Sequence, residues 1–128
     1  MDRFKLRETI LREIEKPLIP EQRYSVLEFG AEPDSSRIQT EAFQLAIDRV
    51  SEAGGGKICV PAGKYLTGAI TLKSQVELHL ESPDTWIQFV SEEPEKHYPL
   101  VFSHWEATPC YNYSPLIYAC DAHDIAVT

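Results

Sequence analysis

The hydrophobic pattern at the start of the chain is that of an amphipathic helix followed by an extended linker. Residues 3–16 place four apolar side chains on one side of a helix, with charged residues opposite: Leu6, Ile10, Leu11 and Ile14. Pro17 and Pro20 then end the helix, because proline lacks the backbone N–H that a helix uses and favours extended neighbours. We therefore separate residues 1–20, a helix and linker, from a domain over residues 21–128.

A stronger helix pattern covers residues 40–53. Its apolar residues recur at positions i, i+3, i+4 and i+7 of one face: Phe43, Ala46, Ile47 and Val50. The polar residues are predicted to face away from the core: Glu41, Gln44, Asp48, Arg49 and Glu52. Thr40 is a suitable N-cap, and Glu41 suits the first turn, where a negative charge meets the positive end of the helix dipole. The glycine run at 54–56 ends the helix, and one of these glycines is expected in the left-handed conformation.

Short segments of period two, typical of strands, fill much of the remaining chain. Residues 76–80 alternate most strictly, with polar Glu77 and His79 between apolar neighbours. Other strands are predicted over residues 24–29, 58–60, 65–66, 69–72, 86–90, 115–119 and 125–127. Glycine, proline, serine and aspartate separate most of them, as expected at turns. Residues 91–114 form a polar excursion, rich in aromatic residues, that is too long for a tight turn.

These short strands fit a sandwich, a barrel or a solenoid, and their spacing alone does not distinguish the three. The Asn-Gly and Asp-Gly pairs typical of tight hairpins are absent from the chain, which weakens the antiparallel alternatives. One amphipathic helix followed only by short strands favours a capped solenoid. In such a stack of parallel strands, a helix over the first coil covers the open backbone row.

Composition narrows the class of protein. The 128 residues carry a net charge of −8, and their 12 lysines and arginines form no basic stripe, so no nucleic-acid partner is expected. No apolar run approaches the roughly 18 residues of a membrane span, so no membrane partner is expected. The N-terminus lacks the apolar core of a secretory signal, which predicts a cytoplasmic protein. Cys59, Cys110 and Cys120 lack zinc-site spacing and are expected as reduced thiols, so we predict no metal site and no cofactor.

A series of motifs over residues 28–81 resembles the opening of polygalacturonases, family 28 of the glycoside hydrolases. The series contains a Phe-Gly-Ala turn at 29–31, a polar loop around Asp34, the helix, the glycine run and a Pro-Ala-Gly-Lys-Tyr turn at 61–65. Residues 103–119, SHWEATPCYNYSPLIYA, are similar to a segment of the family's bacterial branch. In those relatives arginine is usual at the position of His104, and glycine is usual at those of Ala107 and Ser35. The resemblance covers about residues 24–128.

The resemblance implies an all-β fold, a right-handed single-stranded parallel β-helix whose N-terminal coils carry a capping α-helix. It also implies a glycosidase that acts on the α-linked galacturonides of pectin, with pectic oligosaccharide or polygalacturonate as its binding partner. Pectate-lyase-like and tailspike-like scaffolds share the first part of the resemblance. A non-catalytic binding or structural β-helix is therefore the alternative function.

The catalytic motifs of the family do not occur in the chain, which has no Asp-Asp pair, no Gly-His-Gly and no Arg-Ile-Lys. We therefore expect the catalytic aspartates to lie beyond residue 128, no catalytic residue within the chain, and an inactive isolated chain. Asp121 and Asp124 precede a predicted strand and are interpreted as turn residues. A solenoid cut after residue 128 leaves its last backbone row unpaired, so self-association through this C-terminal edge is expected.

The candidate substrate-binding residues all belong to the aromatic excursion: Trp105, Glu106, Tyr111 and Tyr113. Aromatic faces stack on pyranose rings, and an aromatic and acidic segment beside a solenoid is a suitable wall for a sugar groove. The alternative interpretation is a packed loop whose aromatic residues anchor it to the coil.

Overall fold

The largest sheet of the computed structural model, which describes residues 2–128, contains four parallel strands. Its order is β1 (Arg23–Ser25), β2 (Gly56–Val60), β5 (Val76–Leu80) and β10 (Ala126–Val127). The paired strands are well separated in the sequence, because a parallel pair needs a crossover connection between its members. The rest of each circuit of the chain supplies that connection.

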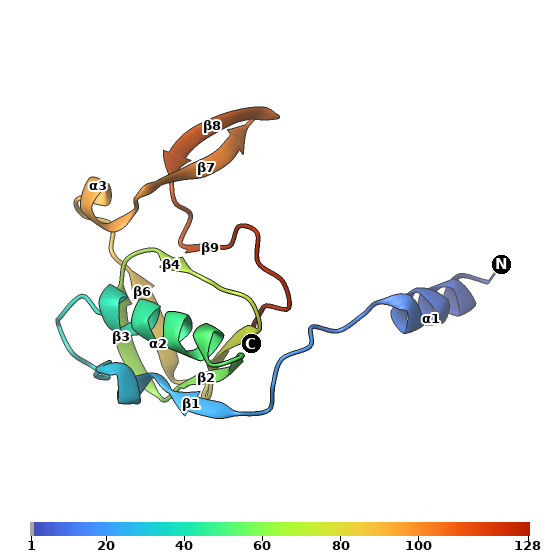
Figure 1. Cartoon of the computed structure of the whole chain (residues 1–128), viewed down its shortest axis with the longest axis horizontal. Helices are drawn as coiled ribbons and strands as arrows, with labels where there is room; N and C mark the ends of the chain where they lie inside the picture. Colours follow the sequence, from blue (N-terminus) through green and yellow to red (C-terminus); the bar gives the residue numbers. More distant parts are fainter. Residues whose placement is uncertain (1) are drawn as a thin grey trace.

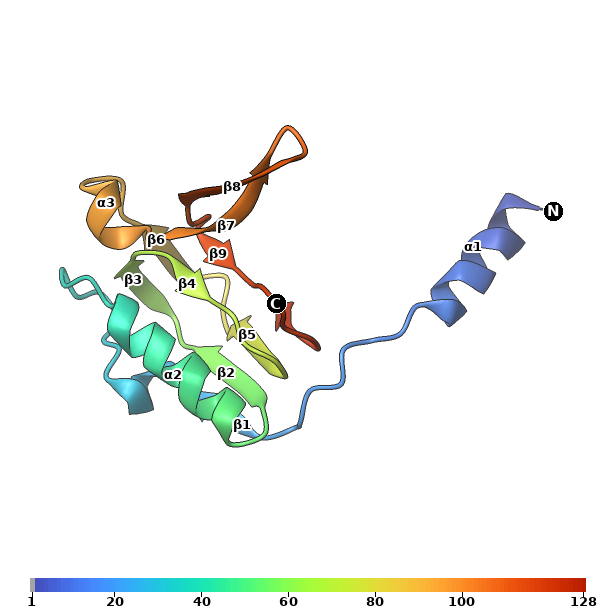
Figure 2. The same ribbon diagram turned by 45° about the horizontal axis from the view of Figure 1, so that its top comes forward.

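Two smaller parallel sheets complete the circuits. In one, β3 (Gly63–Thr67) pairs with β6 (Thr85–Phe89), and in the other β4 (Ile70–Thr71) pairs with β9 (Ile117–Tyr118). The strands β2, β3 and β4 thus form one circuit, and β5, β6 and β9 form the next (Figure 2). Each circuit adds one strand to each sheet, which is the arrangement of a β-solenoid.

The segment of β1, which precedes the two circuits, is less regular than the sequence predicts. The strand expected over residues 24–29 ends at Ser25, and a 3-10 helix, η1 (Val26–Phe29), follows it. The cause is a local capping box: the hydroxyl of Ser25 accepts a hydrogen bond from the N–H of Leu27 (3.3 Å), and the carboxylate of Glu28 accepts one from the N–H of Ser25 (2.9 Å). These short local bonds compete with a strand ladder and end it.

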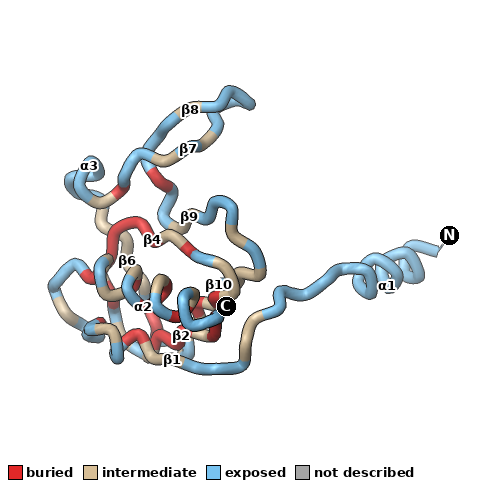
Figure 3. The backbone as a smooth tube through the Cα atoms, in the orientation of Figure 1, coloured by how far each residue is buried: buried red, intermediate tan, exposed pale blue. Residues whose placement is uncertain are grey.

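Inward-facing side chains of all three sheets meet in one core. Ile58 and Val60 of β2 are fully buried; on the other side of the strand Lys57 is partly exposed, whereas Cys59 is also buried. Tyr65 of β3 packs edge-on against Phe43, with ring centroids 5.8 Å apart. Figure 3 shows buried residues along the body of the molecule, around β2 and β4.

The helix α2 (Thr40–Glu52) covers the first circuit, and its four predicted core residues are all buried. The prediction of Thr40 as N-cap is wrong, because Gln39 occupies that position and makes no side-chain cap bond. The hydroxyl of Thr40 instead accepts a hydrogen bond from the N–H of Gly68 (2.7 Å), which ties the helix to the loop after β3. Gly54 follows the helix with φ of +103°, the left-handed conformation predicted for the glycine run.

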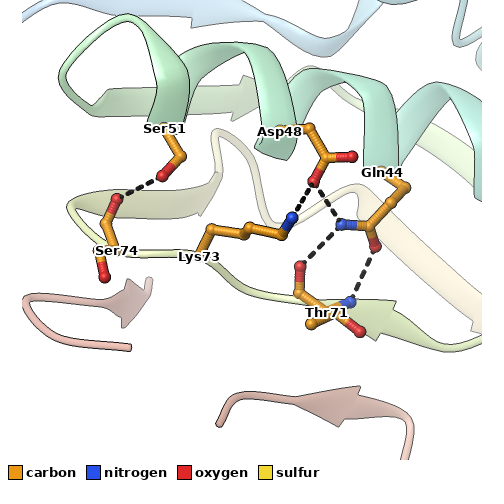
Figure 4. A network of polar contacts seen from close by, with 6 residues as sticks. All are labelled: Gln44, Asp48, Ser51, Thr71, Lys73 and Ser74. Carbon is orange, nitrogen blue, oxygen red and sulfur yellow. Dashed lines mark hydrogen bonds and ion pairs between the residues drawn. The ribbon is translucent and has the colours of Figure 1, made fainter. Parts of the chain in front are cut away.

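Polar side chains of α2 satisfy the backbone of the neighbouring circuit (Figure 4). The amide of Gln44 accepts a hydrogen bond from the N–H of Thr71 (2.9 Å) and donates one to its C=O (3.0 Å). The Ser51 hydroxyl donates to the C=O of Ser74 (2.9 Å). The sequence predicted that Gln44 and Asp48 both face away from the core. Instead, the two side chains are hydrogen-bonded to each other (3.0 Å) on the side of α2 that borders β4.

The N-terminal helix α1 (Arg3–Glu13) lies away from the sheets (Figure 1). It ends at Glu13 instead of the predicted residue 16, because Ile14 is already extended. None of its residues is buried, so its apolar side faces solvent. The linker rejoins the body where the N–H of Leu18 donates to Asp124 Oδ1 (2.9 Å). No helix in residues 2–128 is long and apolar enough to cross a membrane.

Residues 91–114 contain a short helix and an antiparallel hairpin in place of an irregular excursion. The helix α3 (Pro94–His97) precedes β7 (Leu100–Trp105) and β8 (Thr108–Tyr113). The two turn residues, Glu106 and Ala107, have φ of +44° and +66°, a conformation that usually selects Asn-Gly. Sequence reasoning missed the hairpin because neither turn residue is asparagine or glycine.

Candidate functional site

The hairpin of β7 and β8 projects from the body between β6 and β9 (Figures 1 and 2). Three contacts hold its base. The N–H of Ser114 donates to the C=O of Pro99 (2.8 Å), and the hydroxyl of Tyr118 donates to the C=O of Phe102 (2.9 Å). Tyr98 is buried, which raises the pKa of its hydroxyl, and this hydroxyl donates to the C=O of Val90 (2.5 Å).

One face of the hairpin is aromatic. Tyr111 lies directly opposite Phe102 in the ladder, with ring centroids 6.0 Å apart, and His104 packs edge-on against Phe102 at 5.4 Å. Tyr113 lies two residues further along β8 and therefore on the same side. The exposed fractions of Phe102, Tyr111 and Tyr113 are 47%, 74% and 51%, so these rings remain accessible. We call Phe102, His104, Tyr111 and Tyr113 the aromatic face.

The other two candidate residues do not belong to the aromatic face. Trp105 is one position beyond His104 and pairs with Thr108, so it lies on the opposite side of the hairpin, with 67% of its surface exposed. Glu106 lies in the turn at the tip. The structure therefore brings Tyr111 and Tyr113 together and separates Trp105 and Glu106 from them.

Sequence reasoning missed Phe102 and His104, which complete the aromatic face. The signal was the alternation of Phe102 and His104 on one strand and of Tyr111 and Tyr113 on the next. That alternation has meaning only once the two segments are paired, because only the register places residues directly opposite each other.

The alternative interpretation, a packed loop anchored by these aromatic residues, does not describe the hairpin. The anchors are Tyr98 and Tyr118, which lie outside the two strands, whereas Trp105, Tyr111 and Tyr113 are all more than half exposed. An exposed group of aromatic rings on a rigid ladder is a surface suited to binding a flat apolar face of a ligand.

A cleft of about 730 Å³ lies between α2, β4 and the segment of α3, away from the aromatic face. Three polar side chains in its lining are already paired: Gln44 with the backbone of Thr71, and Asp48 with the ammonium group of Lys73 (3.2 Å). This cleft therefore borders the contact between helix and strand, and we do not place the site there.

The remaining candidates for chemistry have structural roles. Asp121 and Asp124 have φ of +52° and +54°, as turn residues do, which confirms their interpretation from the sequence. Two hydrogen bonds lower the pKa of the Asp124 carboxylate below its ordinary value. The larger effect comes from the backbone N–H of Leu18 and the smaller from the side chain of His123. Within residues 2–128, no group of three or more His, Cys, Asp or Glu side chains is arranged to hold a metal ion.

No family model matches the chain. A solved structure, a hyperthermoactive exopolygalacturonase from Thermotoga maritima, is 40% identical with a TM-score of 0.85, over 97% of this chain and 27% of that one. A probable polygalacturonase of Vitis vinifera is 29% identical, over 81% of this chain and 22% of its own length. The chain is polygalacturonase-like. A family 28 exopolygalacturonase from Yersinia enterocolitica is 28% identical with a TM-score of 0.70, over 84% of this chain and 20% of that one.

The comparisons also reach beyond polygalacturonases. The mannuronan C5-epimerase AlgE3 of Azotobacter vinelandii is 36% identical, over 53% of this chain and 5% of its own length. The polygalacturonase relatives reported above match 81% to 97% of the chain, whereas the epimerase match extends over 53%. Together these relatives confirm the resemblance to polygalacturonases and the all-β class predicted from the sequence. The chain spans only 20% to 27% of the polygalacturonase relatives reported above.

Proposed function

We propose that the chain is the N-terminal part of a polygalacturonase-like glycoside hydrolase that acts on the α-linked galacturonides of pectin. In this proposal the three sheets are the first coils of a right-handed single-stranded parallel β-helix, and α2 is their cap. The observation that carries it is the match to the Thermotoga exopolygalacturonase over 97% of the chain.

The aromatic face supplies the binding function. Galacturonide rings have an apolar face of C–H groups, which stacks on aromatic rings, and Tyr111 and Tyr113 add hydroxyl groups that bond to sugar hydroxyls. The ladder between β7 and β8 holds Tyr111 opposite Phe102, so little side-chain freedom is lost on binding. The chain thus contributes the cap, the first coils and one wall of the sugar groove.

Catalysis needs more than these residues provide. Hydrolysis of a glycosidic bond requires one carboxylic acid to protonate the leaving oxygen and a second carboxylate to activate water or to attack. The paired-aspartate motifs of the family are absent from the sequence, and Asp121 and Asp124 hold turns. We expect the isolated 128-residue chain to bind galacturonides without hydrolysing them.

The second candidate function is a non-catalytic binding or structural β-helix. The match to an epimerase over 53% of the chain favours it, because the first coils are then a scaffold shared by proteins with different activities. The aromatic face argues against the purely structural form of this candidate, since such a scaffold has no use for exposed rings on a projecting hairpin.

Calorimetric titration with an oligogalacturonide tests the proposal. Tyr111→Ala should weaken binding about tenfold, because it removes a stacking ring. Trp105→Ala is the matched control on the opposite side of the same hairpin and should leave the dissociation constant within about twofold. A reducing-end assay on polygalacturonate should show no release above that of the denatured chain. Equal affinities for wild type and Tyr111→Ala would contradict the binding role, and released reducing ends would contradict the inactivity.

A further inference from the structure

The outer surface of the sheet formed by β3 and β6 carries a second arrangement suited to acidic sugars. Tyr65 and Thr67 of β3 point inward and are fully buried, so Lys64 between the turn and Tyr65 points outward, together with Leu66. The register places Trp86 directly beside Lys64, and Gln88 beside Leu66. Trp86 is 62% exposed and Lys64 is exposed as well.

The ammonium group of Lys64 lies over the indole of Trp86, 5.2 Å from the ring centroid. Within residues 2–128 the lysines in ion pairs are Lys57, Lys73 and Lys96, and Lys64 is in none. Its positive charge therefore contacts only the weakly negative ring face, which leaves most of its hydrogen-bonding capacity open to an anion. Cross-strand pairing thus holds a cation and a half-exposed aromatic ring side by side.

The backbone at Lys64 is fixed by Asp34 of the polar loop that precedes α2. Asp34, with φ of +60°, donates its N–H to the C=O of Lys64 (2.8 Å) and accepts from the N–H of Lys64 through Oδ1 (2.9 Å). This two-bond clamp gives the polar loop a definite role and places Lys64 in a rigid frame. The Asp34 carboxylate is occupied by that clamp and makes no ion pair with the Lys64 ammonium group in residues 2–128.

We propose that Lys64 and Trp86 form a binding site for a uronate residue of an acidic sugar chain. The ammonium group of Lys64 pairs with the carboxylate of the sugar, and the exposed part of the indole contacts its C–H face. A neutral sugar would satisfy only the ring, and a small inorganic anion only the lysine, so the pair selects a ligand that is both flat and acidic. The choice of galacturonide as the ligand to test rests on the function proposed above.

The two tryptophans of the chain allow a selective test by fluorescence. In a Trp105→Phe variant, emission comes from Trp86 alone, and titration with a galacturonide oligomer should change it saturably. The fully methyl-esterified oligomer is the neutral probe and should change it much less. Lys64→Met should weaken the oligomer's effect about fivefold, because the ion pair is lost. Lys5→Met removes the same charge from the exposed helix α1 and should leave the titration unchanged.

The outcomes separate this site from the aromatic face. Equal titrations for Lys64→Met and Lys5→Met, or equal effects of the acidic and esterified oligomers, would overturn the uronate site. If the fluorescence of Trp86 did not change on titration, the uronate site would also be overturned, even if calorimetry showed binding that depends on Tyr111. Conversely, a Trp86 titration that depends on Lys64 would uphold this site even if Tyr111→Ala had no effect and the aromatic face failed its own test.

Discussion

The side-chain amide of Gln44 pairs with both backbone polar groups of Thr71, as a neighbouring β-strand would. On its other side, β4 pairs with β9, through the N–H of Ile70 to the C=O of Leu116 and the N–H of Leu72 to the C=O of Tyr118. Without Gln44, the N–H and C=O of Thr71 that border α2 would lack a protein partner. The helix thus closes the first coil by hydrogen bonding as well as by covering its core.

Replacing Gln44 with alanine should lower the free energy of unfolding by about 1–3 kcal/mol, because the partly buried N–H and C=O of Thr71 lose their partners. Denaturant unfolding followed by circular dichroism measures the change. Arg49→Ala, on the exposed side of the same helix, is the control and should change stability by less than about 0.5 kcal/mol. If both variants unfold at the same denaturant concentration, the hydrogen bonds between the Gln44 side chain and the Thr71 backbone do not stabilise β4 as a neighbouring strand would.

Much of the local structure follows from the sequence, and long-range pairing does not. The spacing of Phe43, Ala46, Ile47 and Val50 predicts both the helix and its buried face, because the period of 3.6 depends only on neighbouring residues. The partner of Gln44 lies 27 residues further along the chain, so the amide was assigned to the solvent side. Only the three-dimensional register shows which polar group meets it.

The candidate site shows the same limit. Four residues of the segment 91–114 are visible in the sequence as candidates to act together, the aromatic Trp105, Tyr111 and Tyr113 and the acidic Glu106. Whether two of them share a face depends on the turn at Glu106 and Ala107, whose conformation neither residue type favours. The pair of Lys64 and Trp86 is likewise invisible before the parallel register of β3 and β6 is known.

Ala107→Gly should stabilise the hairpin by about 0.5–1 kcal/mol, because glycine adopts the left-handed conformation without the penalty paid by a β-carbon. The relatives that the sequence resembles usually have glycine at this position. Since the hairpin can open locally, the change should appear as slower hydrogen exchange in β7 and β8. Ala122→Gly, at a position without positive φ, should not slow exchange there. Faster exchange in the hairpin of Ala107→Gly would contradict the assigned turn.

The contact between Asp124 and the linker should weaken in acid. The hydrogen bond from the N–H of Leu18 lowers the pKa of Asp124, so the contact is complete above the ordinary aspartate pKa of about 3.9 and is lost as the pH falls through the lowered value. The amide chemical shift of Leu18 should therefore titrate only in strongly acidic solution. In Asp124→Asn that titration should disappear. A Leu18 shift that titrates identically in both proteins would show that another group is responsible.

The C-terminal edge should cause self-association of the isolated chain. The strand β10 is the last in its sheet, Leu116 and Val127 are each half exposed, and open edges with apolar side chains recruit further strands. We expect sedimentation at micromolar concentrations to show species larger than a monomer. Val127→Lys places a charge on that edge and should shift the distribution towards the monomer. A wild-type chain that sediments as a monomer throughout would contradict the prediction.

The most direct test of the proposed function is a backbone NMR titration of the 128-residue chain with a galacturonide oligomer. The account predicts that amide shifts of β7 and β8 around Tyr111 and Phe102 change in a saturable way. Amides of α1 and of the outer side of α2 should stay unchanged. Shifts confined to α1 or α2, or no shifts at any ligand concentration, would contradict the assignment of the aromatic face as a galacturonide-binding wall.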